Sequence, residues 1–341
     1  MAPLVALVIL LTVVFLLSLV LGSTWVPVRR VIEVLLAVTD DRDAAAIVVS
    51  TVRLPRSFTA MLSGAALGIA GLQMQTLFRN PLADPFALGV SSGASLGVAL
   101  VVLGSGYGAA AAFGASLGVR GDVLVIAAAI AGSTVVLGLV LAVSTYIPNP
   151  TTVLILGLMF GYAVSAIVTV LVGASSPERL QQWAMWGFGS FSGVTWQRLR
   201  LFAPLTLGGV LIACATSKQL NALLLGENYA RSMGLAVRRA RLVTMLGASV
   251  LGAVVTAFCG PITFLGVAVP HLCRGLLGTS DHRVLVPAVV LMGGTVALVA
   301  QIVSLLPGSA GILPLNAVTS LLGAPVVVAV LLRSRRGVFG R

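Results

Sequence analysis

The chain has 341 residues, of which 58% are hydrophobic and only 9% are charged. Soluble globular domains carry about 25% charged residues, so this composition excludes an ordinary water-soluble enzyme. The 21 basic and 9 acidic residues give a net charge of +12. Because the basic residues are scattered between apolar runs, we interpret the excess as orientation charge beside a lipid bilayer and expect no nucleic-acid partner.

Apolar segments of membrane-spanning length recur along the chain. A helix of about 20 residues crosses about 30 Å of hydrocarbon. We therefore expect an all-α polytopic membrane protein with about ten transmembrane helices, forming a single transmembrane domain over residues 1–341. The predicted spans lie near residues 4–22, 57–78, 88–106, 122–143, 152–173, 201–217, 240–258, 263–277, 284–306 and 314–332. The segment at 263–277 is short enough to be a half-helix followed by a turn.

The charged loops predict which side of the membrane each segment faces. Ten spans place both termini on one side. If that side is the cytoplasm, the inner loops and tail carry 12 basic and 3 acidic residues, against 9 and 6 outside. The basic residues concentrate in the loop at 218–241 and in the tail. We therefore expect a multi-pass protein of the cytoplasmic (inner) membrane with both termini cytoplasmic.

A short outer helix is predicted over about residues 176–186, before the sixth span. Ser176, Pro177 and Glu178 have the order of an N-cap, a proline at the first helical position and an acid in the first turn. Glycines are frequent, 38 in all, and pairs such as Gly64/Gly68 and Gly93/Gly97 have G-x-x-x-G spacing. This spacing predicts tight packing between helices.

Groups that could perform catalysis are scarce. His271 and His282 have no carboxylate at ligand spacing, so we predict no metal site and no catalytic residue. The sequence has no G-x-x-x-x-G-K-[ST] motif, because its sole lysine, Lys218, lies between Ser and Gln. We expect that the chain is not an enzyme, binds no cofactor and does not hydrolyse ATP by itself.

The predicted spans also lack charged residues at their centres, where ion-coupled transporters and proton pumps usually carry them. The polar side chains that remain are Gln73, Gln75 and Gln301. They either bond between helices or line a polar path. Energy for any pumping must then come from another subunit.

Four stretches together carry a family pattern. They begin R-L-P-R-S-F-T-A-M at residue 53, L-G-E-N-Y-A-R-S-M-G-L at 225, G-P-I-T-F-L-G-V-A-V-P-H-L-C-R-G at 260 and P-L-N-A-V-T-S-L-L-G-A-P-V at 314. In unbroken order from about residue 50 to residue 335, the chain resembles the FecCD-type permease family. These proteins are the membrane subunits of ABC importers for iron-siderophores, haem and vitamin B12.

The resemblance implies the type II ABC importer permease architecture, with a dimer around a central pathway. The second permease subunit would be an identical or a related chain. Two ABC ATPase subunits would bind ATP and Mg on the cytoplasmic face, and a substrate-binding protein would dock outside. We accordingly expect an importer permease for an iron-siderophore complex, with haem or vitamin B12 as alternatives and a secondary transporter as a less favoured one.

The loop at about 218–239 corresponds to the element through which the family couples to its ATPase. The coupling residues that the resemblance carries over are Leu225, Gly226, Glu227, Ala230, Arg231, Gly234 and Leu235. Positive-inside anchoring is an alternative explanation for the flanking Arg238, Arg239 and Arg241.

On the outer face, Arg53 and Arg56 match arginines that in the family pair with acidic residues of the binding protein. Snorkelling of the side chains at the start of the second span is the alternative. Many relatives carry another arginine and an acidic residue before the last span, where this chain has Leu305 and Ile312. The departure suggests weaker or asymmetric docking.

For the gate, the family points to the loop at 146–152 and to the start of the third span near Ser91 and Ser92. Pro148 and Pro150 break helical hydrogen bonding, and Thr151 and Thr152 can satisfy the freed groups, although a plain turn explains the same residues. The pathway-lining candidates are Gln73, Met74, Leu77 and Met159.

Overall fold

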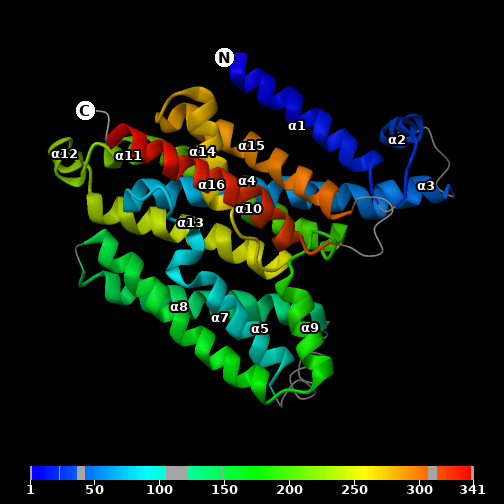
Figure 1. The fold of residues 1–341 in the computed structure, drawn as a ribbon, viewed down its shortest axis with the longest axis horizontal. Helices are drawn as coiled ribbons and strands as arrows, with labels where there is room; N and C mark the ends of the chain where they lie inside the picture. The colour runs from blue at the N-terminus through cyan, green and yellow to red at the C-terminus, as the bar shows by residue number, and fades with distance from the viewer. Residues whose placement is uncertain are drawn as a thin grey trace.

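The computed structural model describes residues 2–22, 24–36, 43–104, 121–147, 149–305 and 313–338. Within these ranges the chain forms helices and no strand (Figure 1). Seven helices are long and apolar enough to cross a membrane, and three shorter apolar helices accompany them. The prediction of an all-α polytopic protein is confirmed, with one helix at each predicted span.

The helices follow the predicted spans closely. The long ones are α1 (Ala2–Val20), α4 (Leu54–Phe78), α7 (Gly121–Ser144), α8 (Pro150–Gly173), α10 (Trp196–Ala215), α13 (Val237–Cys259) and α15 (His282–Ser304). The shorter apolar helices are α5 (Val90–Val102), α14 (Leu265–Leu277) and the apolar part of α16 (Leu315–Val338). The helix at α14 is short, as the predicted half-helix requires.

Several shorter elements connect the spans. The predicted outer helix is α9 (Pro177–Gly187), with Ser176 at its N-cap position. The predicted coupling loop contains α11 (Ser217–Leu224) and α12 (Glu227–Ser232). A 3-10 turn, η2 (Pro85–Leu88), precedes α5.

The sequence analysis did not predict the elements between α1 and α4. They are α2 (Val28–Leu35), α3 (Ala44–Ile47) and the π-helical segment η1 (Val48–Arg53). Asp43 caps α3 by accepting a hydrogen bond from the Ala45 backbone N–H at 3.2 Å. Because α3 and η1 run into α4 without a break, the second span is a continuous helix over Ala44–Phe78.

Helix α4 forms the centre of the subunit. In its most apolar window, 83% of the residues of this span are buried, against 28% for α1 and 22% for α10. It packs against α10, α13, α14 and α15. Small residues allow this: a Cβ atom added to Gly64 would lie 2.0 Å from the backbone oxygen of Gly293 in α15. The close packing expected from the Gly64/Gly68 spacing is therefore present.

A second group of helices lies beside this centre. Helix α5 packs against α7 and α8, and the three lie together on one side of α4 and α13 (Figure 1). Gly93 of α5 faces Gly132 of α7, where an added Cβ would lie 2.5 Å from the Gly132 oxygen. Glycine contacts therefore fix this group as well.

The connecting elements gather at opposite ends of the helices. Helices α2 and α3 lie at one end of the long axis, and α11 and α12 lie at the other (Figure 1). Helix α4 runs between the two ends and separates the predicted docking arginines from the predicted coupling residues.

Candidate coupling and docking sites

The turn between α11 and α12 depends on Gly226. Its backbone angles of φ 115° and ψ 149° lie in a region that is open essentially to glycine alone. A side chain at this position would also meet Arg79, because an added Cβ atom would lie 2.7 Å from its Nη2. The predicted coupling residue Gly226 thus has a local reason to be glycine.

Four further predicted coupling residues form one motif at the end of α12. The Gly234 N–H donates to the Arg231 carbonyl at 2.9 Å, and the Leu235 N–H donates to the Ala230 carbonyl at 3.0 Å. These two bonds, with Gly234 at φ 82°, define a Schellman motif. One short helix, α12, therefore forms within the stretch L-G-E-N-Y-A-R-S-M-G-L, with a glycine of positive φ on each side of it.

Glu227 ties α12 to the start of α13. Its carboxylate accepts a hydrogen bond from Arg241 and lies 3.6 Å from Nη2 of Arg231. The Arg241 side chain is only 14% exposed. Arg241 therefore has a structural role inside the subunit that membrane anchoring alone would not require.

The outward surface of this helix pair includes three large apolar side chains. Leu225 is 65% exposed, Tyr229 55% and Met233 50%, although they lie at an end of the molecule with many arginines. Apolar side chains that protrude in this way suit insertion into a groove of a partner protein.

A cleft of about 660 Å³ joins residues that were predicted in three different roles. Leu77, predicted on the pathway, and Thr151, predicted at the gate, line it together with the coupling residues Leu225, Gly226 and Glu227. These residues come from α4, α8 and the α11–α12 pair. No local sequence signal indicated that they would meet.

Arg79 connects α4 to this cleft. It ends α4 in a left-handed conformation with φ 46°, which is unfavourable for a residue other than glycine. Its Nη2 donates to the Leu223 carbonyl near the C-terminus of α11 at 3.3 Å. The same carbonyl also accepts from the Gly226 N–H at 3.2 Å, so Arg79 adds a second donor at the C-terminus of α11. The sequence analysis missed Arg79.

The predicted gate loop leads into the start of α8. Pro150 is the first residue of α8, and Asn149 caps the helix by accepting a hydrogen bond from the Thr151 N–H at 2.9 Å. Proline is favourable at this position because its missing N–H has no partner there in any case. Thr152 is exposed. Pro148 and the side chain of Pro150 lie outside the described residues.

The other gate residues lie at the start of α5. Ser91 and Ser92 are both half-buried, and a Cβ atom added to Gly161 of α8 would lie 3.3 Å from Oγ of Ser92. Helix α5 therefore meets α8 at a point where α8 has no side chain. The gating role of these serines stays a prediction.

Two of the pathway candidates are buried within the subunit, and their role on the pathway stays a prediction. Gln73 is 1% exposed and Met74 is fully buried within the subunit. Gln73 faces Gly247 of α13, so neither side chain can line an open passage in this conformation. Met159 on α8 is 53% exposed, and its role stays a prediction.

The remaining two intramembrane glutamines bond between helices. Nε2 of Gln75 donates to the Val267 carbonyl of α14 at 3.2 Å, and its Oε1 accepts from Arg274 at 2.6 Å. Nε2 of Gln301 lies 3.4 Å from Oγ of Ser57 in α4. Of the two interpretations left open for these residues, interhelical bonding applies to Gln75 and Gln301.

At the opposite end, Arg53 is engaged inside the subunit. It is 5% exposed, and its Nη1 donates to the carbonyls of Leu19 at 2.7 Å and Val20 at 2.8 Å. Its Nη2 donates to Thr24. The guanidinium thus closes the C-terminus of α1, where the last carbonyls lack partners. Docking by Arg53 stays a prediction, and it would require the side chain to leave these bonds.

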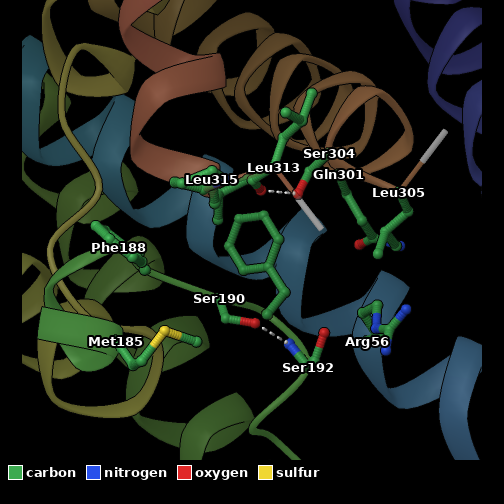
Figure 2. A pocket seen from close by; sticks show the side chains of 13 residues that line it. Arg56, Met185, Phe188, Ser190, Ser192, Gln301, Ser304, Leu305, Leu313 and Leu315 are labelled. Atoms are coloured by element: carbon green, nitrogen blue, oxygen red, sulfur yellow. Dashed lines mark hydrogen bonds between the residues drawn. The ribbon is translucent and has the colours of Figure 1, made fainter. Parts of the chain in front are cut away.

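Arg56 differs from Arg53 because it borders a cavity. The cavity has a volume of about 230 Å³ and lies between α4, the segment after α9 and the ends of α15 and α16. Figure 2 shows Arg56 and Gln301 on one side, opposite Met185 and Phe188. Nε of Arg56 has no hydrogen-bond partner. This Nε is buried, and docking by Arg56 stays a prediction.

The sequence departs from many relatives at two positions, and the structure describes one of them. Leu305 lines the cavity, so an apolar side chain stands beside Arg56. Ile312 lies outside the described residues. Oγ of Ser304 donates to the Leu313 carbonyl at 2.6 Å and joins the ends of α15 and α16.

Comparisons with known proteins agree with this arrangement. The model of the FecCD transport family matches residues 10–333. The vitamin B12 import system permease protein of Klebsiella pneumoniae subsp. pneumoniae is 36% identical over 327 residues, covering 96% of this chain and 92% of that protein. The corresponding protein of Escherichia coli O9:H4 is 35% identical over 286 residues, or 84% and 83% of the two chains.

A solved structure is similar over the whole chain. It is described as an inward-facing conformation of a metal-chelate type ABC transporter, and it superimposes with a TM-score of 0.81 at 28% identity. The match covers 97% of this chain and 99% of the other. The chain is therefore a multi-pass ABC importer permease of the metal-chelate type and belongs to the FecCD transport family.

Proposed function

We propose that this chain is the membrane subunit of an ATP-driven importer that passes an iron-siderophore complex from a substrate-binding protein into the cytoplasm. The observation that carries the proposal is the α11–α12 pair, which is held rigidly by two glycine turns and presents exposed apolar side chains. In this proposal the pair faces the cytoplasm and seats in an ATPase subunit. Both termini then lie on the cytoplasmic side.

Energy for transport would come from two ATPase subunits that bind ATP and Mg. The chain has no phosphate-binding motif of its own, and its intramembrane polar side chains at Gln75 and Gln301 are occupied by contacts between helices. A second permease subunit, identical or related, would complete the pathway. The exposed face of α8, which includes Met159 and Tyr162, offers apolar surface for such a partner or for lipid.

Vitamin B12 is the second candidate substrate. Two relatives that are 35% and 36% identical are vitamin B12 permeases, which favours a corrinoid for this chain as well. Haem has no comparable observation in its favour. A ferric siderophore and a corrinoid are both large chelates that enclose their metal, and an uncharged passage suits such a substrate because nothing in it would bind the chelate tightly.

Transport in proteoliposomes tests the proposal. The chain is reconstituted with its ATPase subunits and its binding protein, and uptake of an iron-labelled siderophore and of labelled cyanocobalamin is measured with and without ATP. We expect ATP-dependent uptake of the siderophore. Uptake of cyanocobalamin alone would favour the second candidate, and uptake without any ATPase subunit would identify a secondary transporter.

A further inference from the structure

His282, at the start of α15, connects three helices through its ring. The residue is 1% exposed. Nδ1 of the imidazole lies 2.8 Å from Oδ1 of Asn221 in α11. On the other side, Nε2 lies 2.8 Å from Oγ1 of Thr76, two residues before the end of α4. One buried ring thus bridges the helix next to α12 and the central helix of the subunit.

The bonds around Asn221 fix the direction of each hydrogen. Its Oδ1 accepts from the backbone N–H of His282 at 2.8 Å, and its Nδ2 donates to Oδ1 of Asp281 at 2.6 Å. Because a backbone N–H can only donate, the atom that faces it must be the amide oxygen. The same oxygen faces Nδ1 of His282, so this ring nitrogen carries a hydrogen. Asn221 therefore holds α11 to the first turn of α15.

The bond to Thr76 extends the connection into α4. Oγ1 of Thr76 also lies 2.8 Å from the Leu72 carbonyl, one turn earlier in the same helix, so its single hydrogen is shared between this carbonyl and Nε2 of His282. Thr76 is 2% exposed, and its neighbour Gln75 is bonded to α14. Any displacement of α11 must therefore break the His282 bridge or move α4 and α15 with it.

We infer that His282 is a positioning residue that transmits the movement of the α11–α12 pair to α4 and α15. The inference rests on the proposed function, because it requires an ATPase to move that pair. Arg79 provides a second connection at the C-terminus of α11, but its side chain is exposed and its single bond to Leu223 is longer, at 3.3 Å. The connection through His282 is buried, and its two ring nitrogens contact side chains of two different helices, α11 and α4.

Two substitutions at position 282 separate its two bonds. His282→Gln places an amide near the position of Nε2 and retains a partner for Thr76, whereas His282→Asn places one near Nδ1 and retains a partner for Asn221. His271→Gln is the matched control. His271 is the other histidine of the chain, and its Nε2 donates to the Pro81 carbonyl at 2.7 Å without reaching α11.

The measured quantity is the number of ATP molecules hydrolysed per substrate imported, in proteoliposomes that contain the complete transporter with its binding protein. We expect this ratio to rise about fivefold in both His282 variants, as for the loss of one buried hydrogen bond, and to stay unchanged in His271→Gln. An unchanged ratio in both His282 variants, with a lower melting temperature, would overturn the inference and leave His282 a purely structural residue.

A second pair keeps the test decisive if the His282 variants do not assemble. Thr76→Val removes the hydroxyl but retains the shape of the side chain, and Thr76→Ser retains the hydroxyl. We expect the ratio to rise in Thr76→Val and to be close to the unsubstituted value in Thr76→Ser. Equal ratios in the two variants would contradict the inference. If the unsubstituted transporter shows no ATP-dependent uptake at all, the proposed function fails instead.

Discussion

Gly71 of α4 and Gly266 of α14 approach each other so closely that a Cβ atom added to Gly71 would lie 1.8 Å from the Gly266 carbonyl oxygen. The next nearest atom, the Gly266 carbonyl carbon, would lie 2.4 Å away. Both atoms belong to the backbone and cannot turn aside as a flexible side chain would. The spacing between α4 and α14 is therefore fixed by the absence of a side chain.

Gly71→Ala should destabilise the subunit by about 3 kcal/mol, because the added methyl group forces the two helices apart. The measurement is the apparent melting temperature of the purified protein in detergent. Gly138→Ala is the control, since an added Cβ there has open space on the surface of α7. The control should melt at the same temperature as the unsubstituted protein or slightly higher, because alanine favours the helix. Similar losses in both variants would contradict the packing argument.

The sequence predicts the spans well because each one is a local apolar run. It fails where the pattern is interrupted. Because η1 contains Ser50, Thr51 and Arg53, the predicted second span begins at residue 57, whereas the helix begins at Ala44. In the structure, the Ser50 hydroxyl donates to the Ala46 carbonyl of its own helix. A polar residue whose side chain forms a hydrogen bond to a carbonyl of its own helix does not end that helix.

Residues of the candidate coupling site were predictable from the sequence only where they lie in one short stretch of the chain. Gly226 and Gly234 were identified through the family resemblance of one short stretch, and in the structure they stand at the two ends of α12. The bridge from Thr76 through His282 to Asn221 joins residues that are 206 and 61 positions apart, so no local pattern indicates it. Gln73 was proposed for the pathway because it is polar, and polarity alone does not show which face of a central helix a side chain occupies.

The two glycines of the coupling helix should differ in their tolerance of alanine. Gly226→Ala combines an unfavourable backbone region with a collision against Arg79, and we expect a cost of about 2 kcal/mol or more. Gly234→Ala should lower stability by only about 1 kcal/mol, the cost of placing a residue other than glycine in the left-handed region. No steric cost is added, because nothing lies within 4 Å of an added Cβ.

The measurement for these variants is transport together with ATP hydrolysis in the reconstituted complex. Gly226→Ala should reduce transport more than Gly234→Ala, while both proteins reach the membrane in normal amounts. A bulky residue at Gly234 should uncouple transport from ATP hydrolysis, since it alters the surface that meets the ATPase in the proposed function. Normal ATP-driven uptake with a bulky residue at this position would argue against the coupling assignment.

Substitution of Arg53 should affect the stability of the protein, whereas substitution of Arg56 should affect its affinity for the binding protein. Arg53→Ala leaves the carbonyls of Leu19, Val20 and Thr24 without their donor, and we expect a loss of stability of about 3 kcal/mol. Arg56 donates no hydrogen bond within the described residues, so Arg56→Ala should hardly change the melting temperature. Its affinity for the binding protein should instead fall about tenfold, measured by interferometry on the immobilised transporter. The opposite pattern would reverse the two roles.

Asp84 gives a pH-dependent prediction. Its Oδ1 accepts from the Phe86 N–H at 2.8 Å and begins η2. Burial raises the pKa of this carboxyl to about 6, and the hydrogen bond from Phe86 opposes the rise in part. The folded protein therefore binds this proton more tightly than the unfolded chain does. It follows that the carboxyl lowers stability as the pH rises from about 4 to about 6.

Asp84→Asn keeps an oxygen that can accept from Phe86 but removes the charge. We expect the variant to melt at a higher temperature than the unsubstituted protein at pH 7.5, and the difference to shrink as the pH is lowered through 6 towards 4.5. The measurement is a series of thermal melts in detergent across this range. Asn80→Asp tests the specificity of the effect, because Asn80 is also in the segment after α4 and its Oδ1 accepts from the Leu82 N–H at 3.0 Å. An Asp84→Asn difference that is the same at every pH would mean that the carboxyl is not the titrating group, because only an ionisable side chain at this position can make the two curves converge.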